Sequence, residues 1–263
     1  MIQSLESIPT LFLLLLVVGG TALVTAVLTW IIRTHVSERV HIGNNEVAGF
    51  LFAGVSVIYG VLLAFLVLVV WQTFQDAALV VEQEANTLVD IFRIGQELPT
   101  PFSTELESYS VEYANRVVND EWPLMVQGDE SPGVQDTIEK FWAVHRAIEA
   151  EPNAQQNHTE KLFDLLQDLG NKRRIRLLDS RSELPGLMWA LLIGGEIVTI
   201  GFTFFFRAPT SAAHLTMAAL FAGLLAFVLV LIIELDSPFA GSVRLEPRAF
   251  QQALELFARL LAP

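Results

Sequence analysis

The sequence predicts an all-α polytopic membrane protein with four transmembrane helices and a helical soluble insert between helices 2 and 3. Two observations lead to this fold class. Hydrophobic residues form 52% of the 263-residue chain and its mean hydropathy is +0.48, whereas a soluble domain has about 45–50% apolar residues spread along its sequence. Here the apolar residues are concentrated in four blocks, and each block is close in length to the roughly 20 residues that a helix needs to cross a bilayer. The rest of the chain is markedly polar.

The first block runs from about Ile8 to Ile32 and the second from about Val47 to Trp71, and neither contains a charged residue. Trp30 and Trp71 stand at block ends, where the indole ring favours the headgroup layer. The first block is longer than the apolar core of a signal peptide and no basic segment precedes it, so we expect it to be retained as a span.

The third block, from about Leu187 to Phe206, contains one charged residue, Glu196, and the fourth runs from about Ala212 to Ile233. Four crossings place both termini on the same side of the membrane as the insert. We expect residues 1–73 to hold the first two membrane helices, 74–185 the insert, 186–236 the last two membrane helices, and 237–263 a turn and an amphipathic helix.

The orientation is predicted from basic residues near the spans, because cytoplasmic loops carry an excess of Lys and Arg. Arg33 and Arg39 follow the first span and none precedes it, which alone would direct the N-terminus and the insert outward. A larger basic cluster lies on the insert side, so we expect a cell-membrane protein whose insert and termini are cytoplasmic. Its members are Lys172, Arg173, Arg174, Arg176 and Arg181 before the third span, and Arg244 and Arg248 after the fourth.

The insert is interpreted as four helices. The first continues the second span, because no Gly or Pro interrupts the sequence before Gly95. Thr100 is expected to cap the next helix with Pro101 at its first position, and Ser131 and Pro132 repeat this start signal for a third. Pro123 and residues 127–133 are expected to break the chain between them. A fourth helix is expected to run into the third span and carries Leu162, Leu165, Leu166 and Leu169.

The insert is strongly acidic. Between residues 74 and 185 there are 21 Asp and Glu against 10 Lys and Arg, which accounts for −11 of the chain's net charge of −13. One interpretation is a solvated helical surface, and the other is a field that concentrates cations at a pore vestibule. This charge argues against a nucleic-acid partner, because a phosphate-binding surface needs clustered Lys and Arg.

The tail contains a short amphipathic helix. Pro238 ends the fourth span, and Pro247 opens the new helix. The latter half of this helix carries one basic residue, Arg259, whereas helices that lie on a lipid surface are usually basic. We therefore expect its apolar stripe to pack on the insert or on a neighbouring subunit. The stripe consists of Phe250, Leu254, Phe257 and Leu261.

No enzyme motif is present, and we expect no catalytic residues and no cofactor. The sequence lacks the glycine-rich phosphate loops, the nucleophile elbow G-x-S-x-G and the zinc motif H-E-x-x-H. It contains no cysteine, which excludes disulfides and thiolate metal sites. The histidines have no ligand spacing, so we expect no metal site either; they are His35, His41, His145, His158 and His214.

Glu196 is the most informative single residue. A carboxylate near the bilayer centre costs about 2.5–3.5 kcal/mol on insertion scales, so it should face the bundle interior or water. Thr199 and Thr203 follow at helical spacing on the same face. The three residues are consistent either with an ion pathway or with a hydrogen-bonded carboxyl group that fixes helix packing.

The second span carries small residues on one face. Such residues let helices approach closely in lipid, and this interpretation applies to Gly49, Ala53, Gly60 and Ala64. The alternative is a pore lined by this span. Hydrophobic constrictions can gate a pore, so an apolar lining does not exclude conduction; the candidate lining residues are Ser56, Tyr59 and Leu63.

Three segments resemble the prokaryotic bestrophin-like domain family, and the resemblance covers nearly the whole chain. The first is NEVAGFLFAGVSVIYG at residues 45–60, which continues to LAFL at residues 63–66 and to Trp71. The others are DEWP at residues 120–123 and LDSPFAG at residues 235–241. The family is remotely similar to bestrophins, which are pentameric anion channels.

The resemblance implies a cytoplasmic helical domain between spans two and three, a second span that lines a pore, and a Pro-Phe-Gly turn after span four. Here the turn reads PFAG at residues 238–241, one residue longer. The acidic calcium-binding run of animal bestrophins is missing after this turn, with only Glu234 and Asp236 nearby, so calcium gating is not expected.

Together these observations predict a channel-like homo-oligomer in the lipid bilayer that passes small inorganic ions. The alternative is a non-conducting membrane scaffold or sensor whose acidic insert binds a protein partner. The ion stays open, because bestrophin kinship favours anions while the acidic insert favours cations.

Overall fold

The computed structural model describes residues 10–35, 45–151, 156–206 and 208–262, and within these ranges all regular structure is helical. Arg39, His41 and the expected start of the first span at Ile8 lie outside the described residues. The helices are α2 (Thr10–His35), α3 (Asn45–Gln96), α4 (Phe102–Arg116), a π-helical turn η2 (Val117–Glu121), α5 (Trp122–Met125), α6 (Pro132–Glu149), α7 (Gln156–Asp179), α8 (Gly186–Thr203), α9 (Ser211–Asp236) and α10 (Arg248–Leu261). They form the two compact units described below.

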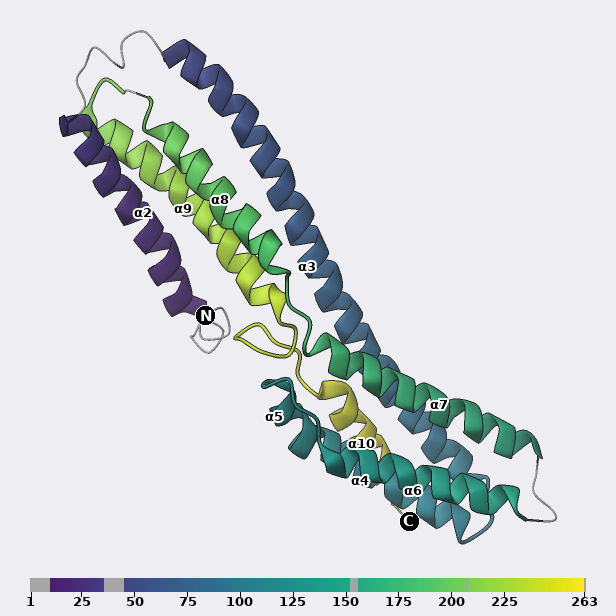
Figure 1. Cartoon of the computed structure of the whole chain (residues 1–263). Coiled ribbons are helices and arrows are strands. Elements are labelled where there is room, and N and C mark those ends of the chain that lie inside the picture. The colour runs from purple at the N-terminus through teal and green to yellow at the C-terminus, as the bar shows by residue number, and fades with distance from the viewer. Residues whose placement is uncertain (1–9, 36–44, 152–155, 207, 263) are drawn as a thin grey trace. The chain divides into compact units, whose positions relative to one another are not determined.

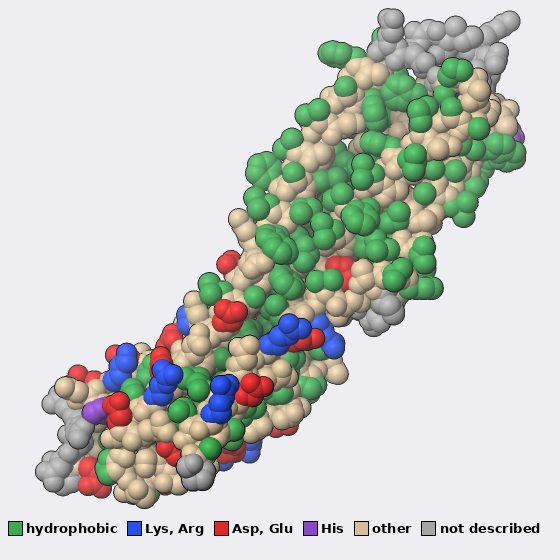
Figure 2. Space-filling view, turned by 180° about the vertical axis from the view of Figure 1, so that it is seen from behind, with side chains coloured by type: hydrophobic (Ala, Val, Ile, Leu, Met, Phe, Trp, Pro, Cys, Tyr) green, Lys and Arg blue, Asp and Glu red, His purple; other side chains and the backbone are tan. Residues whose placement is uncertain are grey.

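The first unit, here called the membrane unit, contains α2, α3 as far as Gln72, α8 and α9 (Figure 1). All four predicted spans are confirmed as helices long and apolar enough to cross a membrane. Their apolar side chains remain largely exposed: only 11% of the most apolar stretch of α2 is buried. Figure 2 shows hydrophobic side chains over the spans. A soluble monomer rarely exposes so large an apolar surface, whereas a bilayer would cover it.

Helices α2 and α9 pack along one another in the membrane unit. Gly223 of α9 faces α2 in this contact, since a Cβ atom there would lie in ordinary van der Waals contact with Val18, at 3.6 Å. On the other side of the unit, Phe52 of α3 meets the rings of Phe206 and Phe221 edge to face.

The second unit, here called the insert unit, contains α3 from Thr73 onward, α4 to α7 and α10. Its single hydrophobic core draws buried residues from α3, α4, α6, α7 and α10. The predicted continuation of the second span into the insert is confirmed, since α3 runs unbroken to Gln96. Lys, Arg, Asp and Glu side chains gather over the surface of this unit in Figure 2.

The tail helix α10 packs on the insert of its own chain. Phe250 and Phe257 are fully buried, and the Phe257 ring stacks on Phe92 of α3 at 4.4 Å. Of the two surfaces that the sequence left open for this stripe, the insert is therefore the one it covers. Leu261 is the exception in the predicted stripe, because half of its surface is exposed.

Three local predictions were wrong. Pro101, not Thr100, occupies the N-cap of α4. Pro123 does not break the chain, because the π-helical turn η2 precedes it and the Trp122 amide bonds back to the Val117 carbonyl. Helix α7 does not run into the third span, because it ends at Asp179 and α8 begins at Gly186. Pro185 stands directly before α8, and a proline disfavours the helical conformation in the residue that precedes it.

Candidate functional site

The part of α8 that carries Glu196 packs against α3 in the membrane unit. Glu196 is 9% exposed. One residue earlier in α8, Gly195 lies directly against the ring of Tyr59, so closely that a Cβ atom could not fit. The Tyr59 hydroxyl donates a 2.8 Å hydrogen bond to the Leu192 carbonyl, which already accepts a bond within the helix. A glycine at 195 is therefore what lets this phenol reach the α8 backbone.

Two buried oxygens near this contact have no hydrogen-bond partner: Oε1 of Glu196 and Oγ of Ser56. Ser56 lies about one helical turn from Tyr59 on α3, and α3 and α8 run antiparallel (Figure 1). Both oxygens therefore belong to the same level of the bundle. Unpartnered buried oxygens are costly, which makes this level of the spans chemically unusual.

The two threonines of the predicted pathway bond to their own helix. The hydroxyl of Thr199 donates to the Gly195 carbonyl at 2.7 Å and that of Thr203 to the Ile200 carbonyl at 2.6 Å. Back-bonding of this kind satisfies a hydroxyl inside a span. Both threonines are buried on the same face as Glu196.

Helix α3 presents its predicted residues on two different faces. Tyr59 and Leu63 are each 5% exposed and lie inside the bundle of a single chain. Ala53, Gly60 and Ala64 are exposed, while Gly49 and Ser56 are half-buried. No atom lies within 4 Å of the place that a Cβ on Gly60 would occupy. The small-residue face is thus largely uncovered, whereas the candidate pore-lining residues Tyr59 and Leu63 are buried within the single chain.

The insert unit contains a buried ion network that the sequence analysis missed. Arg176, with no exposed surface, donates two hydrogen bonds to Glu84, at 2.7 and 2.9 Å, and one to Glu121 at 2.8 Å. Arg173 pairs with Glu121 at 2.6 Å. Tyr113 donates to Glu84 at 2.7 Å. The two guanidinium groups and two carboxylates balance in charge and connect α3, η2 and α7, and Tyr113 adds α4.

The network sets the protonation of its members. Burial acts against ionisation of Glu121, but the charge of Arg176 and the hydrogen bonds of Arg173 hold its pKa below the usual range. Burial likewise acts to lower the pKa of Arg176, and neighbouring Glu84 and Glu121 raise it overall. The pKa of Tyr113 is raised well above its usual value, first by burial and then by the charge of Glu84. Glu121 and Arg176 are therefore both held in their charged forms.

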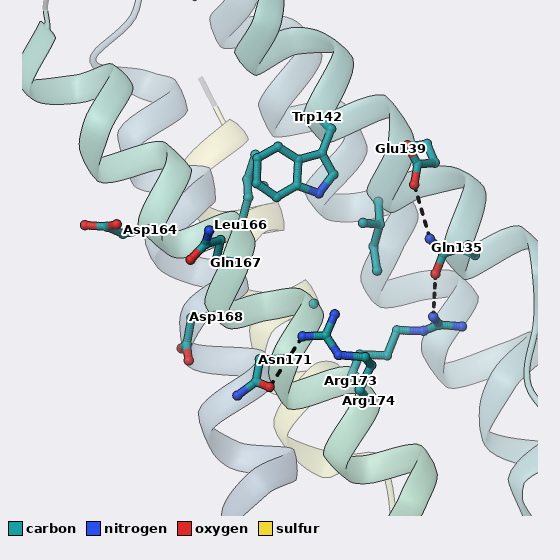
Figure 3. A pocket seen from close by; sticks show the side chains of 12 residues that line it. Gln135, Glu139, Trp142, Asp164, Leu166, Gln167, Asp168, Asn171, Arg173 and Arg174 are labelled. Atoms are coloured by element: carbon teal, nitrogen blue, oxygen red, sulfur yellow. Dashed lines mark hydrogen bonds between the residues drawn. The ribbon is translucent and has the colours of Figure 1, made fainter.

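A polar cavity of about 870 Å³ lies between α6 and α7 of the insert unit (Figure 3). Gln135 connects it to the ion network, because its amide accepts a 2.8 Å hydrogen bond from Arg173 and donates to Glu139. Across the cavity, Arg174 bonds to the side chain of Asn171. Among the described residues no group of three or more His, Asp or Glu could hold a metal ion.

The fold and these sites define a four-span helical membrane protein with a helical domain inserted between spans two and three. The family model described as the Bestrophin-like domain matches residues 19–250. The chain therefore belongs to the bestrophin-like family, and the resemblance seen in its sequence motifs is confirmed. The search among curated proteins gave no match.

Three solved structures share the fold. The crystal structure of a membrane protein variant is 13% identical, with a TM-score of 0.68, and the match covers 91% of this chain and 96% of that one. Two variants of a bacterial bestrophin homologue from Klebsiella pneumoniae are 14% and 16% identical, with TM-scores of 0.65 and 0.62. The matches cover 97% and 94% of this chain and 99% and 98% of the homologue.

Proposed function

We propose that this chain is a subunit of a channel-like homo-oligomer that passes small inorganic ions across the cell membrane, with its insert and termini on the cytoplasmic side. The observation that carries the proposal is the uncovered small-residue face of α3, formed by Ala53, Gly60 and Ala64, in a chain of the bestrophin-like family. Small residues in a span favour close contact between helices. Copies packed through this face would enclose a path beside α3.

The polar level around Glu196 supports the same function. Intramembrane carboxylates are costly and mark ion or proton pathways in many membrane proteins. In this proposal, the side-chain oxygens of Glu196 and Ser56 interact with a passing ion, and Tyr59 holds α3 and α8 at a fixed distance. Bestrophin kinship favours anions, while the acidic insert favours cations.

A second function has its own supporting observation. The polar cavity between α6 and α7, together with the acidic surface of the insert, favours a non-conducting scaffold or sensor that binds a partner through the insert. The ion network, which shares Arg173 with the cavity lining, would hold such a binding surface in shape. This alternative needs no path through the membrane.

Ion flux from proteoliposomes separates the two functions. If the protein is a channel, KCl-loaded vesicles that contain it should release ions faster than protein-free vesicles. The reversal potential in a KCl gradient reports whether cations or anions cross. Gly60→Leu should lower the flux by about tenfold or more, and Ile58→Leu, a conservative change at an exposed apolar position of the same helix, should not. Flux no faster than that of protein-free vesicles, measured with intact and folded oligomers, would favour the scaffold.

A further inference from the structure

A second cavity, of about 630 Å³, lies in the membrane unit at the N-terminal ends of α3 and α9 and the C-terminal end of α8. The rings of Phe52, Phe206 and Phe221 form its wall, with edge-to-face centroid distances of 5.3 and 5.5 Å. Met217 adds a largely exposed apolar side chain. The volume is typical of a ligand site, and aromatic and thioether groups favour an apolar occupant.

The lining offers almost no hydrogen-bonding group to an occupant. His214 lines the cavity, but its Nε2 lies 3.1 Å from the Thr203 carbonyl. A carbonyl only accepts hydrogen bonds, so Nε2 carries the proton and ties α9 to the end of α8. The other ring nitrogen, Nδ1, is buried away from any accessible surface. The cavity therefore suits a hydrocarbon chain better than a polar metabolite.

A positive charge stands at the rim of this cavity. The guanidinium of half-buried Arg33, near the end of α2, lies 3.4 Å from the carbonyl oxygen of Ala208, which lines the cavity, and 3.5 Å from that of Thr210. These contacts are long and weak. No acidic side chain among the described residues forms an ion pair with Arg33, so its charge is available to an anion.

We propose that this cavity holds an acyl chain of an anionic phospholipid whose phosphate pairs with Arg33. An apolar chamber and a guanidinium at its rim match the two ends of such a lipid, and Arg binds phosphate through paired hydrogen bonds. The site lies at the ends of three spans, where phospholipid head groups are found. The surrounding bilayer supplies this ligand, and the site does not depend on ion conduction.

Thermal unfolding of the detergent-purified chain tests the site with defined lipids. Phosphatidylglycerol should raise the melting temperature at lower concentration than phosphatidylcholine, because a ligand of the native state stabilises it. Arg33→Gln keeps donors for the two carbonyl groups but removes the charge, and it should raise the half-saturating phosphatidylglycerol concentration by about tenfold. Arg259→Gln, an exposed residue of α10, removes the same charge elsewhere and should leave the response unchanged.

Met217→Trp fills the chamber and should weaken the response to both phospholipids, while the variant's own melting temperature without lipid shows whether it is folded. Equal responses of the wild type to the two phospholipids, or an unchanged preference in Arg33→Gln, would overturn the proposal. It would also fail if oleate alone reproduced the Arg33-dependent shift, since the ligand would then be a free fatty acid. Dissociation of the oligomer by Met217→Trp with an unchanged lipid response would instead assign the cavity to a second copy of the chain.

Discussion

The guanidinium group of Arg176 and the carboxylate of Glu84 form a two-point ion pair, at 2.7 and 2.9 Å, with neither side chain exposed. Arg176 also lies over the rings of Trp122 and Phe250, at 5.7 and 5.8 Å from their centroids. One residue of α7 thus contacts α3, α5 and α10 at once. The insert can keep this charge buried because each end of the guanidinium has a partner.

Arg176→Leu should destabilise the insert by about 3–5 kcal/mol, because it leaves Glu84 and Glu121 as buried charges with too few partners. Arg176→Lys should recover little, since an ammonium group cannot bond to both carboxylates in the same planar geometry. Hydrogen exchange of the full-length protein measures the loss directly in α3 and α7. Arg174→Leu, at an exposed neighbouring position, is the control, and similar protection in the two Leu variants would contradict the structural role.

The stability of the insert should fall in acid through Glu121. Its folded pKa is lowered, so the folded state binds fewer protons than the unfolded state. The contribution of Glu121 to the stability of the insert is therefore complete above the ordinary carboxyl pKa of about 4.5. It is lost as the pH falls through the lowered pKa of the folded state. Melting temperatures from pH 7 down to 3 should fall more steeply in the wild type than in Glu121→Gln. Asp120→Asn, the exposed neighbour, should keep the wild-type slope.

Glu196→Gln should change the ion flux or its pH dependence while the chain still folds. Glutamine keeps the size and the hydrogen-bonding capacity of Glu196 but loses the titratable charge. Flux from proteoliposomes at several pH values measures the effect, and Glu183→Gln, an acid outside the spans, is the matched control. If Glu196→Gln reproduces the wild-type flux at every pH, the carboxyl group serves helix packing alone.

The hydropathy of the sequence was sufficient to predict the four spans, because a continuous apolar run has few alternatives to a membrane helix. The ion network could not be predicted in the same way. Arg176 lies 92 residues from Glu84 and 55 from Glu121 in the sequence, and no local pattern pairs them. One signal was present: Glu84 falls on the apolar stripe of Val81, Leu88 and Ile91, where an unpaired acid would be costly.

The small-residue stripe shows a second limit of sequence patterns. Periodicity placed Gly49, Ala53, Ser56, Gly60 and Ala64 on one face, but it could not say what that face contacts. The structure leaves most of this face uncovered and buries Tyr59 and Leu63 inside the single chain. Periodicity shows which residues share a face of a helix, but not which surface of another copy that face contacts. The assignment of pore and packing residues therefore stays a prediction.

Reporter fusions should place the insert and the C-terminus in the cytoplasm. Fusions after Gln127 and after Pro263 should give a cytoplasmic signal, and a fusion near Asn44 should give an external one, because Lys and Arg are concentrated on the insert side. Each position should be tested with one reporter that works only in the cytoplasm and one that works only outside. An external signal from the first two fusions would reverse the orientation and leave the four spans in place.

Gly60→Leu should disrupt the oligomer without unfolding the chain. The place of a Cβ on Gly60 is open in the single chain, so a side chain there meets nothing until another copy approaches. Closed rings are the usual assembly of identical subunits, and we expect ring-shaped class averages of the wild type in electron microscopy, with α3 nearest the axis. The variant should give smaller particles with a melting temperature close to that of the wild type.

Gly195→Ala supplies the contrast to Gly60→Leu, because a Cβ on Gly195 would collide with the Tyr59 ring inside one chain. It should lower the melting temperature, whereas Gly60→Leu should change the particle size. The channel proposal requires a ring, while a scaffold tolerates a monomer or a dimer. Wild-type particles that are stable monomers, or dimers with no axial opening, would end the pore interpretation, and unchanged rings in Gly60→Leu would show that this face of α3 is not where the subunits meet.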